Sequence, residues 1–122
     1  MGLDMYLTMG AGDERQTIFQ WRKANQLRAW FVRRASLNPN EEVEVVLDKA
    51  DIIQLRNDIQ SVLLNPKRAP YILPTQAGFF FGSTDYDDYY FETLAGMHDV
   101  LERILVAMNK GVLETVTYSE WW

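Results

Sequence analysis

Near the C-terminus, apolar residues recur at spacings of three and four over about six helical turns. The series consists of Tyr86, Tyr90, Leu94, Met97, Leu101, Ile104 or Leu105, and Met108. This spacing predicts a long helix with one continuous apolar face, and it is the best-supported element of the chain. Asn109-Lys110-Gly111 predicts the helix end, because glycine readily adopts the left-handed conformation of a helix C-terminus.

The segment that leads into this helix, Gly78–Glu92, is rich in both aromatic and acidic residues. Phe79–Phe81 is a continuous apolar run, which favours a strand buried on both faces. Gly82 then allows a tight turn. Ser83 and Thr84 are both candidate N-caps, since a hydroxyl accepts a hydrogen bond from an N–H of the first helical turn. We therefore interpret the segment as a buried strand, a turn and a capped helix start.

Two further helices and three further strands complete the predicted fold. The expected strands cover residues 1–9, 42–47 and 114–122, and the expected helices cover residues 14 or 17 to 35 and 48 to 65. Residues 71–74 are short, apolar and closed by proline, so they are at best an edge strand. We predict a single α+β domain over residues 1–122, of order roughly β-α-β-α-β-α-β, with about four mainly antiparallel strands covered by three helices. We expect the first and last strands to pair, and a ferredoxin-like arrangement is one alternative for the strand order.

The composition limits the class of protein. A net charge of −5 disfavours nucleic-acid binding, and no run reaches the ~20 apolar residues of a membrane span. Cysteine is absent and the N-terminus lacks a signal-peptide pattern, so we expect a cytoplasmic protein. Basic residues gather between Arg15 and Arg34, and acidic residues gather between Asp85 and Glu102. These two segments either attract each other within the fold or present a charged face to a partner.

The acids before the long helix form the first candidate site. Asp85, Tyr86, Asp87, Asp88 and Tyr89 bring carboxylates and phenols into one short segment. Helix capping and solvation explain the carboxylates most simply, because acids favour the positive end of the helix dipole. A cation site is one alternative, but the spacing does not match a calcium loop, and we expect neither a metal nor a cofactor. An acidic patch that faces a partner is the other alternative.

Trp21, Arg22 and Lys23 form the second candidate site. The simplest interpretation places Trp21 in the core and the two cations on a solvated face. The alternatives are a contact with nucleotides or nucleic acid, since aromatic rings and arginine stack on bases and bind phosphates, or a protein interface. Trp30 and the terminal tryptophans are candidates for a homodimer interface. No catalytic motif accompanies these residues, and His98 has no nucleophile motif beside it, so we expect no enzymatic activity.

Four segments together carry a resemblance to a known group of proteins. They are Met1–Leu7, Trp21–Gln26, Gly78–Thr84 with the acidic, tyrosine-rich residues after it, and the aromatic C-terminus. In this order they resemble small proteins of tailed bacteriophages and prophages, over most of the chain. The resemblance implies an accessory protein that acts in the cytoplasm of a bacterial host by binding a host protein, for host takeover or defence evasion. The alternative is a small-ligand or nucleotide-binding protein that uses Arg22, Lys23 and neighbouring aromatics.

Overall fold

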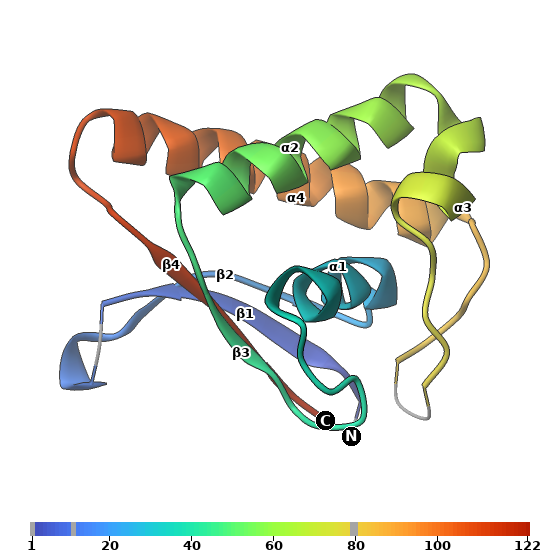
Figure 1. Ribbon diagram of the computed structural model, residues 1–122, viewed down its shortest axis with the longest axis horizontal. Helices are drawn as coiled ribbons and strands as arrows, with labels where there is room; N and C mark the ends of the chain where they lie inside the picture. Colours follow the sequence, from blue (N-terminus) through green and yellow to red (C-terminus); the bar gives the residue numbers. More distant parts are fainter. Residues whose placement is uncertain (1, 11, 79–80) are drawn as a thin grey trace.

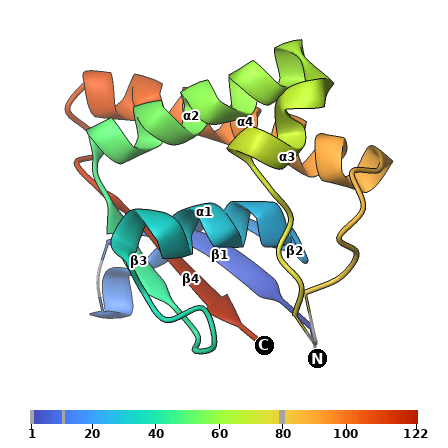
Figure 2. The ribbon, with the colours of Figure 1, turned by 45° about the vertical axis from the view of Figure 1, so that its right-hand side comes forward.

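The computed structural model describes residues 2–10, 12–78 and 81–122, which form an antiparallel sheet with helices over one face (Figure 1). The strands are β1 (Asp4–Met9), β2 (Gln16–Arg22), β3 (Glu44–Leu47) and β4 (Val116–Trp121). The helices are α1 (Asn25–Ala35), α2 (Lys49–Leu64), α3 (Ala69–Ile72) and α4 (Asp88–Asn109), and 3-10 turns occupy Gly12–Glu14 and Pro66–Arg68. Helix α1 lies next to the sheet, and α2 and α4 run side by side beyond it (Figure 2). The predicted α+β class is confirmed.

The strand order is β2-β1-β4-β3, and each neighbouring pair is antiparallel. The predicted pairing of the first and last strands is confirmed, with Asp4 of β1 opposite Trp121 of β4. A ferredoxin-like arrangement has the element order β-α-β-β-α-β, whereas here β1 leads through the 3-10 turn Gly12–Glu14 directly to β2 and pairs with it, so the arrangement is not ferredoxin-like. Strand β2 lies at one edge of the sheet, so only β1 pairs with it in the described part of the chain.

The first helix is shorter than the sequence pattern predicts. The expected start at residue 14 or 17 is wrong, because residues 16–22 pair with β1 as strand β2 and α1 begins only at Asn25. Ile18 and Trp21 fit a helical spacing, but β-branched and aromatic residues also favour strands, and the ladder with β1 decides between the two. The chain turns at Lys23, whose φ of 57° lies in the left-handed region.

The segment between α2 and α4 also differs from the prediction. Residues 71–74 are not an edge strand, because Ala69–Ile72 forms helix α3 with a proline in its first turn, where no N–H is needed. Of the predicted buried strand, Phe79 and Phe80 lie outside the described residues. Phe81 is buried as expected, but its backbone forms a bend rather than a strand. Within the described residues, the fourth strand of the sheet is β2.

Both long helices begin at an aspartate cap. Asp48 accepts a hydrogen bond from the Asp51 N–H, and Asp51 reciprocates, which confirms Asp48 as the cap of α2. Helix α4 is capped by Asp87, whose carboxylate accepts from the Tyr90 N–H at 3.0 Å. The expectation that Ser83 or Thr84 caps this helix is wrong. The Ser83 hydroxyl instead accepts from the Asp85 N–H within the preceding turn.

The core lies between the sheet and the helices, and α4 contributes its predicted apolar stripe. The buried members of that stripe are Tyr90, Leu94, Met97, Leu101, Ile104, Leu105 and Met108, whereas Tyr86 at its start is exposed. Beneath them, Phe31 of α1 stacks on Tyr118 of β4 with ring centroids 4.0 Å apart. These contacts hold α1 over the centre of the sheet. Helix α4 passes over the side of the sheet that contains β2.

A fully buried ion pair joins α1 to β4. The Arg28 Nε donates to both carboxylate oxygens of Glu120 at 3.0 Å, and both side chains are 0% exposed. Glu120 also accepts from the Tyr118 hydroxyl, the Trp122 indole N–H and the Val43 N–H. Burial and the neighbouring Glu120 carboxylate raise the pKa of the Tyr118 hydroxyl well above its ordinary value, so it remains a donor. Because every charge here has close partners, we assign this cluster to folding rather than binding.

Candidate functional site

A largely apolar pocket of about 390 Å³ lies between β2 and the first half of α4. We call it the β2–α4 pocket. It is lined by Phe19, Trp21 and Arg22 from β2 and by Tyr89, Glu92, Thr93 and Gly96 from α4. The Phe19 and Trp21 rings lie 5.5 Å apart and form one wall. A pocket of this size and polarity is typical of sites that hold one apolar group and orient it with a few polar ones.

The two secondary structures explain why these residues meet. Alternate residues of a strand share a face, so Phe19 and Trp21 both point toward the helices. Residues three and four apart share one side of a helix, which brings Glu92, Thr93 and Gly96 to the side of α4 that faces β2. The pocket therefore depends on β2 being a strand, which is why the helix prediction for this segment concealed it.

The Trp21 indole is the polar anomaly of the pocket. Its Nε1 is buried and has no hydrogen-bond partner among the described residues. By contrast, the Trp30 Nε1 donates to the Asp58 carboxylate at 2.9 Å. A buried donor without an acceptor costs roughly 1–3 kcal/mol, so the Trp21 N–H lowers the stability of the fold as it stands.

Gly96 is the second anomaly, because it lies within a continuous helix where packing does not require a glycine. It lies inside the 22 residues of α4, where glycine is less favourable than alanine by roughly 1 kcal/mol. A Cβ placed on Gly96 meets no other atom within 4 Å. Packing within the fold therefore does not require glycine at this position. What glycine does provide is open space on the helix wall of the pocket.

Two polar residues that line the pocket, Arg22 and Tyr89, already interact with protein groups. Arg22 forms an ion pair with Asp4 at 2.6 Å, and its main-chain carbonyl accepts a hydrogen bond from the Tyr89 hydroxyl. Burial raises the pKa of Tyr89, and the Arg22 charge only partly opposes this shift, so the hydroxyl stays protonated and able to donate. Glu92 is exposed and makes no hydrogen bond or ion pair with another described residue.

The structure brings together residues from both candidate sites of the sequence. Trp21 and Arg22 of one site and Tyr89 of the other line the same pocket, although they lie far apart in the chain. Lys23 is exposed beside it, and a Cβ on Gly82 would come within 3.1 Å of the Lys23 Cβ. Trp21 is half-buried and packs against the core, as expected, but it also faces the pocket.

The remaining residues of the acidic segment do not line the pocket. Asp87 caps α4, and Asp85 and Asp88 are exposed nearby. Tyr86 packs edge-on against Tyr90 at 5.0 Å. Within the described residues, no three acidic, histidine or cysteine side chains are grouped closely enough to hold a metal ion. Nor does the described part of the chain contain a helix long and apolar enough to cross a membrane.

Sequence reasoning missed Phe19, Thr93 and Gly96 as site residues. The sequence does not indicate Phe19 as a site residue, because in the predicted helix it lies away from the apolar stripe. Gly96 carried a usable signal, since an isolated glycine within a strong helical repeat often has a packing or functional reason. Thr93 carried no signal that separates it from an ordinary helix residue.

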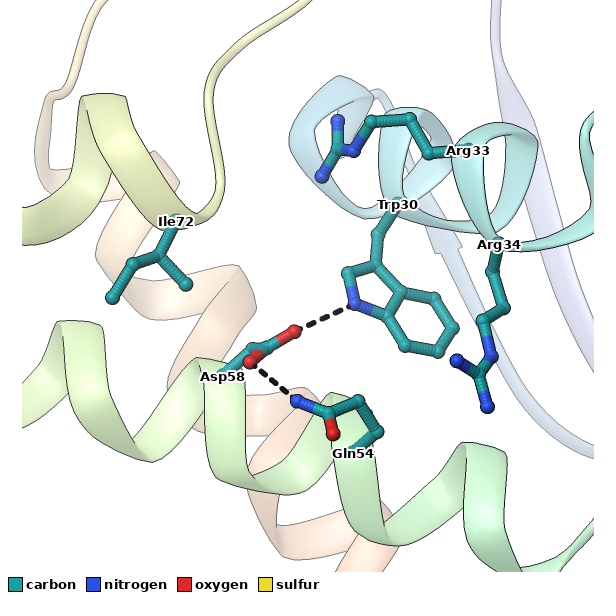
Figure 3. Close-up of a pocket in the computed structure, with 6 residues that line it drawn as sticks. All are labelled: Trp30, Arg33, Arg34, Gln54, Asp58 and Ile72. Atoms are coloured by element: carbon teal, nitrogen blue, oxygen red, sulfur yellow. Dashed lines mark hydrogen bonds between the residues drawn. The ribbon is translucent and has the colours of Figure 1, made fainter.

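A second, more polar pocket of about 290 Å³ lies between α1, α2 and α3 (Figure 3). Figure 3 shows the Trp30 and Gln54 side chains directed at Asp58, whose two carboxylate oxygens accept from them at 2.9 Å each. Arg34 on the same rim pairs with Asp51 at 2.6 Å. Trp30, Gln54 and Arg34 thus have partners, and Arg33 is the lining cation without a hydrogen bond or ion pair to another described residue.

Comparison of the chain with protein-family models, with curated proteins and with solved structures finds no match.

Proposed function

We propose that this protein is a non-catalytic binding module that holds an apolar side chain of a partner protein in the β2–α4 pocket. The observation that carries the proposal is the open apolar space beside Gly96, faced by the Phe19 and Trp21 rings. The buried Trp21 N–H supports it, because a partner carbonyl at this point would satisfy a donor that the fold leaves unsatisfied. Tryptophan, tyrosine and arginine around a desolvated pocket are also the residues enriched at the energetic centre of protein interfaces.

The chemistry of the pocket favours a protein partner over a nucleotide. Arg22 is already paired with Asp4, and Lys23 is not among the lining residues. Glu92 places a carboxylate on the wall, which would repel a phosphate. The resemblance to phage proteins supports a partner in the cytoplasm of a bacterial host, in host takeover or defence evasion. The acids of α4 and of the turn before it would then face that partner beside the pocket.

Affinity capture from bacterial lysate tests the proposal with two matched variants. Gly96→Leu fills the pocket, and Ala95→Leu adds the same side chain at the neighbouring exposed position of α4. The wild type and Ala95→Leu should enrich the same host protein, and Gly96→Leu should reduce the captured amount by at least about tenfold, since a buried anchor contributes most of the binding energy. Equal capture by all three proteins would show that the pocket is not the docking site.

A thermal-shift screen against nucleotides separates the alternative function. A ligand that binds only the folded state raises the unfolding temperature in proportion to its affinity and concentration. We expect no shift with nucleotides or cyclic nucleotides at millimolar concentration. A shift that disappears in Arg22→Ala or Lys23→Ala would support the small-ligand alternative instead.

A further inference from the structure

The β2–α4 pocket lies beside the outer edge of β2, with which no described strand pairs. Lys23 donates its main-chain N–H to the Leu3 carbonyl at 2.8 Å, so the N–H of residue 23 points toward the chain of β1. Main-chain direction alternates along an antiparallel strand, and the register of β2 with β1 is regular from residue 19 to residue 22. Gln20 and Arg22 therefore direct their N–H and C=O groups outward. The hydrogen bond from Tyr89 to the Arg22 carbonyl agrees with this direction.

Gln20 is the exposed centre of this edge. No described residue hydrogen-bonds to its main-chain N–H or C=O. An edge residue with both groups outward is a template for one more strand. A strand added here would run beside α4, with every second side chain directed toward the helices and so into the pocket. This geometry is the one by which an extended peptide binds between a sheet edge and a helix.

A second apolar pocket lies farther along β2 and α4, and we call the strip between these two elements that holds both pockets the groove. This distal pocket, of about 250 Å³, is lined by Met9, Thr17, Ile18, Arg103, Ile104, Ala107 and Leu113. A register shift between Leu7 and Thr8 of β1 leaves Ile18 as an extra residue in β2 at this point. Gly96 and Ala107, one in each pocket, are about 16 Å apart along α4 at ~1.5 Å per residue. An extended chain covers that span with about five residues at ~3.3 Å each.

The two pockets carry opposite charges. Glu92 lines the β2–α4 pocket and Arg103 lines the distal pocket. Neither makes an ion pair or hydrogen bond with another described residue. A bound segment is therefore complementary when it places a basic residue near Glu92 and an acidic residue near Arg103.

We propose that the groove binds one extended segment of a partner protein as an antiparallel strand added to the outer edge of β2. Because β2 runs from the distal pocket toward the β2–α4 pocket, an antiparallel segment runs the opposite way. Its basic residue then lies toward its N-terminus and its acidic residue about five positions later. Apolar residues at alternate positions between them enter the two pockets. This inference rests on the proposed function, to which it adds the conformation, direction and charge order of the bound segment.

A second copy of this chain is a poorer occupant. Pairing of two β2 strands would place residues 16–22 of one copy in the groove of the other, and this segment contains no acidic residue to meet Arg103. The basic residue of this segment, Arg22, already has Asp4 as a partner. The experiment below nevertheless separates this case from a partner peptide.

The test uses an mRNA-displayed library of random peptides of about ten residues, longer than the ~5 residues between the two charges. The library is selected on the wild-type protein and counter-selected on Gly96→Leu. We expect enriched peptides with a basic residue, alternating apolar residues and a later acidic residue. The charge reversal Arg103→Glu should weaken the affinity for the best peptide about fivefold. A peptide in which lysine replaces the acidic residue should bind this variant with the original affinity. Failure to enrich any peptide, or enrichment without this order, would overturn the proposal.

Hydrogen exchange at the Gln20 amide then tests strand addition directly. Binding of the selected peptide should slow exchange of this amide at least about tenfold, since it becomes hydrogen-bonded within a sheet. A peptide N-methylated at the alternate positions whose N–H groups face β2 should lose affinity, because these groups can no longer donate to the edge, and the protein itself is unchanged. Unchanged exchange at Gln20 in the complex would overturn strand addition. Protection of the Gln20 amide in peptide-free protein that sediments as a dimer would also overturn it, because a second copy of the chain would then pair with this edge.

The two proposals fail in different ways. Equal capture of a host protein by wild type and Gly96→Leu removes the pocket as a docking site and contradicts the proposed function. Pocket-dependent capture together with an unprotected Gln20 amide leaves the proposed function standing and contradicts only strand addition.

Discussion

Among the buried polar groups of this protein, those around Arg28 and the one at Trp21 differ in whether they have hydrogen-bond partners. Around Arg28, the guanidinium has a carboxylate, the Gln76 amide oxygen and the Glu41 carbonyl as acceptors. Around Trp21, a buried indole N–H has no acceptor among the described residues, and the same residue lines an open pocket. Both regions lie on the same face of the same sheet, so solvent access alone does not explain the contrast.

The contrast separates stability from recognition. Satisfied buried charges hold elements in register and leave nothing for a ligand, whereas an unsatisfied donor beside an apolar space lowers stability and raises affinity for an acceptor. We therefore expect substitutions near Arg28 to affect unfolding, and substitutions near Trp21 to affect binding.

The largest expected effect is at Glu120. Glu120→Ala leaves Arg28 buried without its carboxylate and should lower the free energy of unfolding by about 3–5 kcal/mol. Urea denaturation followed by circular dichroism measures this change. Glu44→Ala is the matched control, because Glu44 pairs with Arg15 at the surface and should contribute no more than about 1 kcal/mol. Equal losses in the two variants would contradict the assignment of the Arg28 cluster to folding.

A smaller effect compares two tryptophans by the same substitution. Trp30→Phe removes the donor to Asp58, whereas Trp21→Phe removes a donor that has no acceptor. Trp30→Phe should therefore lower the free energy of unfolding by about 1–2 kcal/mol more than Trp21→Phe does. Partner capture should follow the reverse order, with the larger loss in Trp21→Phe. A larger stability loss at Trp21 would indicate that its indole is a structural group.

The smallest expected effect has the opposite sign. Gly96→Ala should raise the free energy of unfolding by about 0.5–1 kcal/mol, since alanine is the better helix former and its Cβ meets nothing. The same urea experiment measures it, and Ala95→Gly at the exposed neighbouring position should show the reverse change. A destabilised Gly96→Ala would mean that the glycine is needed by the fold and would weaken its link to binding.

The sequence predicts the elements whose signals are local and strong. The stripe from Tyr90 to Met108 specifies α4, and Asp48 before a helical repeat specifies the start of α2. The segment Gln16–Arg22 is different, because its apolar residues satisfy both a helical and a strand spacing. Only the ladder with β1 decides, and that ladder is a long-range contact which local spacing does not contain.

For the same reason, the sequence predicts only some of the residues that line the β2–α4 pocket. Trp21, Arg22 and Tyr89 were selected from composition, as aromatics beside charges, but their proximity depends on the placement of α4 over β2. Phe19 and Gly96 become site residues only once β2 is a strand. The acids Asp85 and Asp88 were selected for charge, and the structure leaves them outside the pocket because Asp87 turns the chain into α4.

The position of β4 in the sheet has a consequence for how the chain folds. This strand, the last of those described, is an interior one and separates β1 from β3. Until residues 116–121 are available, β1 and β3 have no common partner, and the Arg28 guanidinium has no counter-ion. Contacts between strands so distant in sequence raise the contact order and slow folding. During synthesis the hairpin of β1 and β2 therefore has two exposed edges until β4 is made. Strand β4 then covers the edge of β1, and no described strand covers the edge of β2.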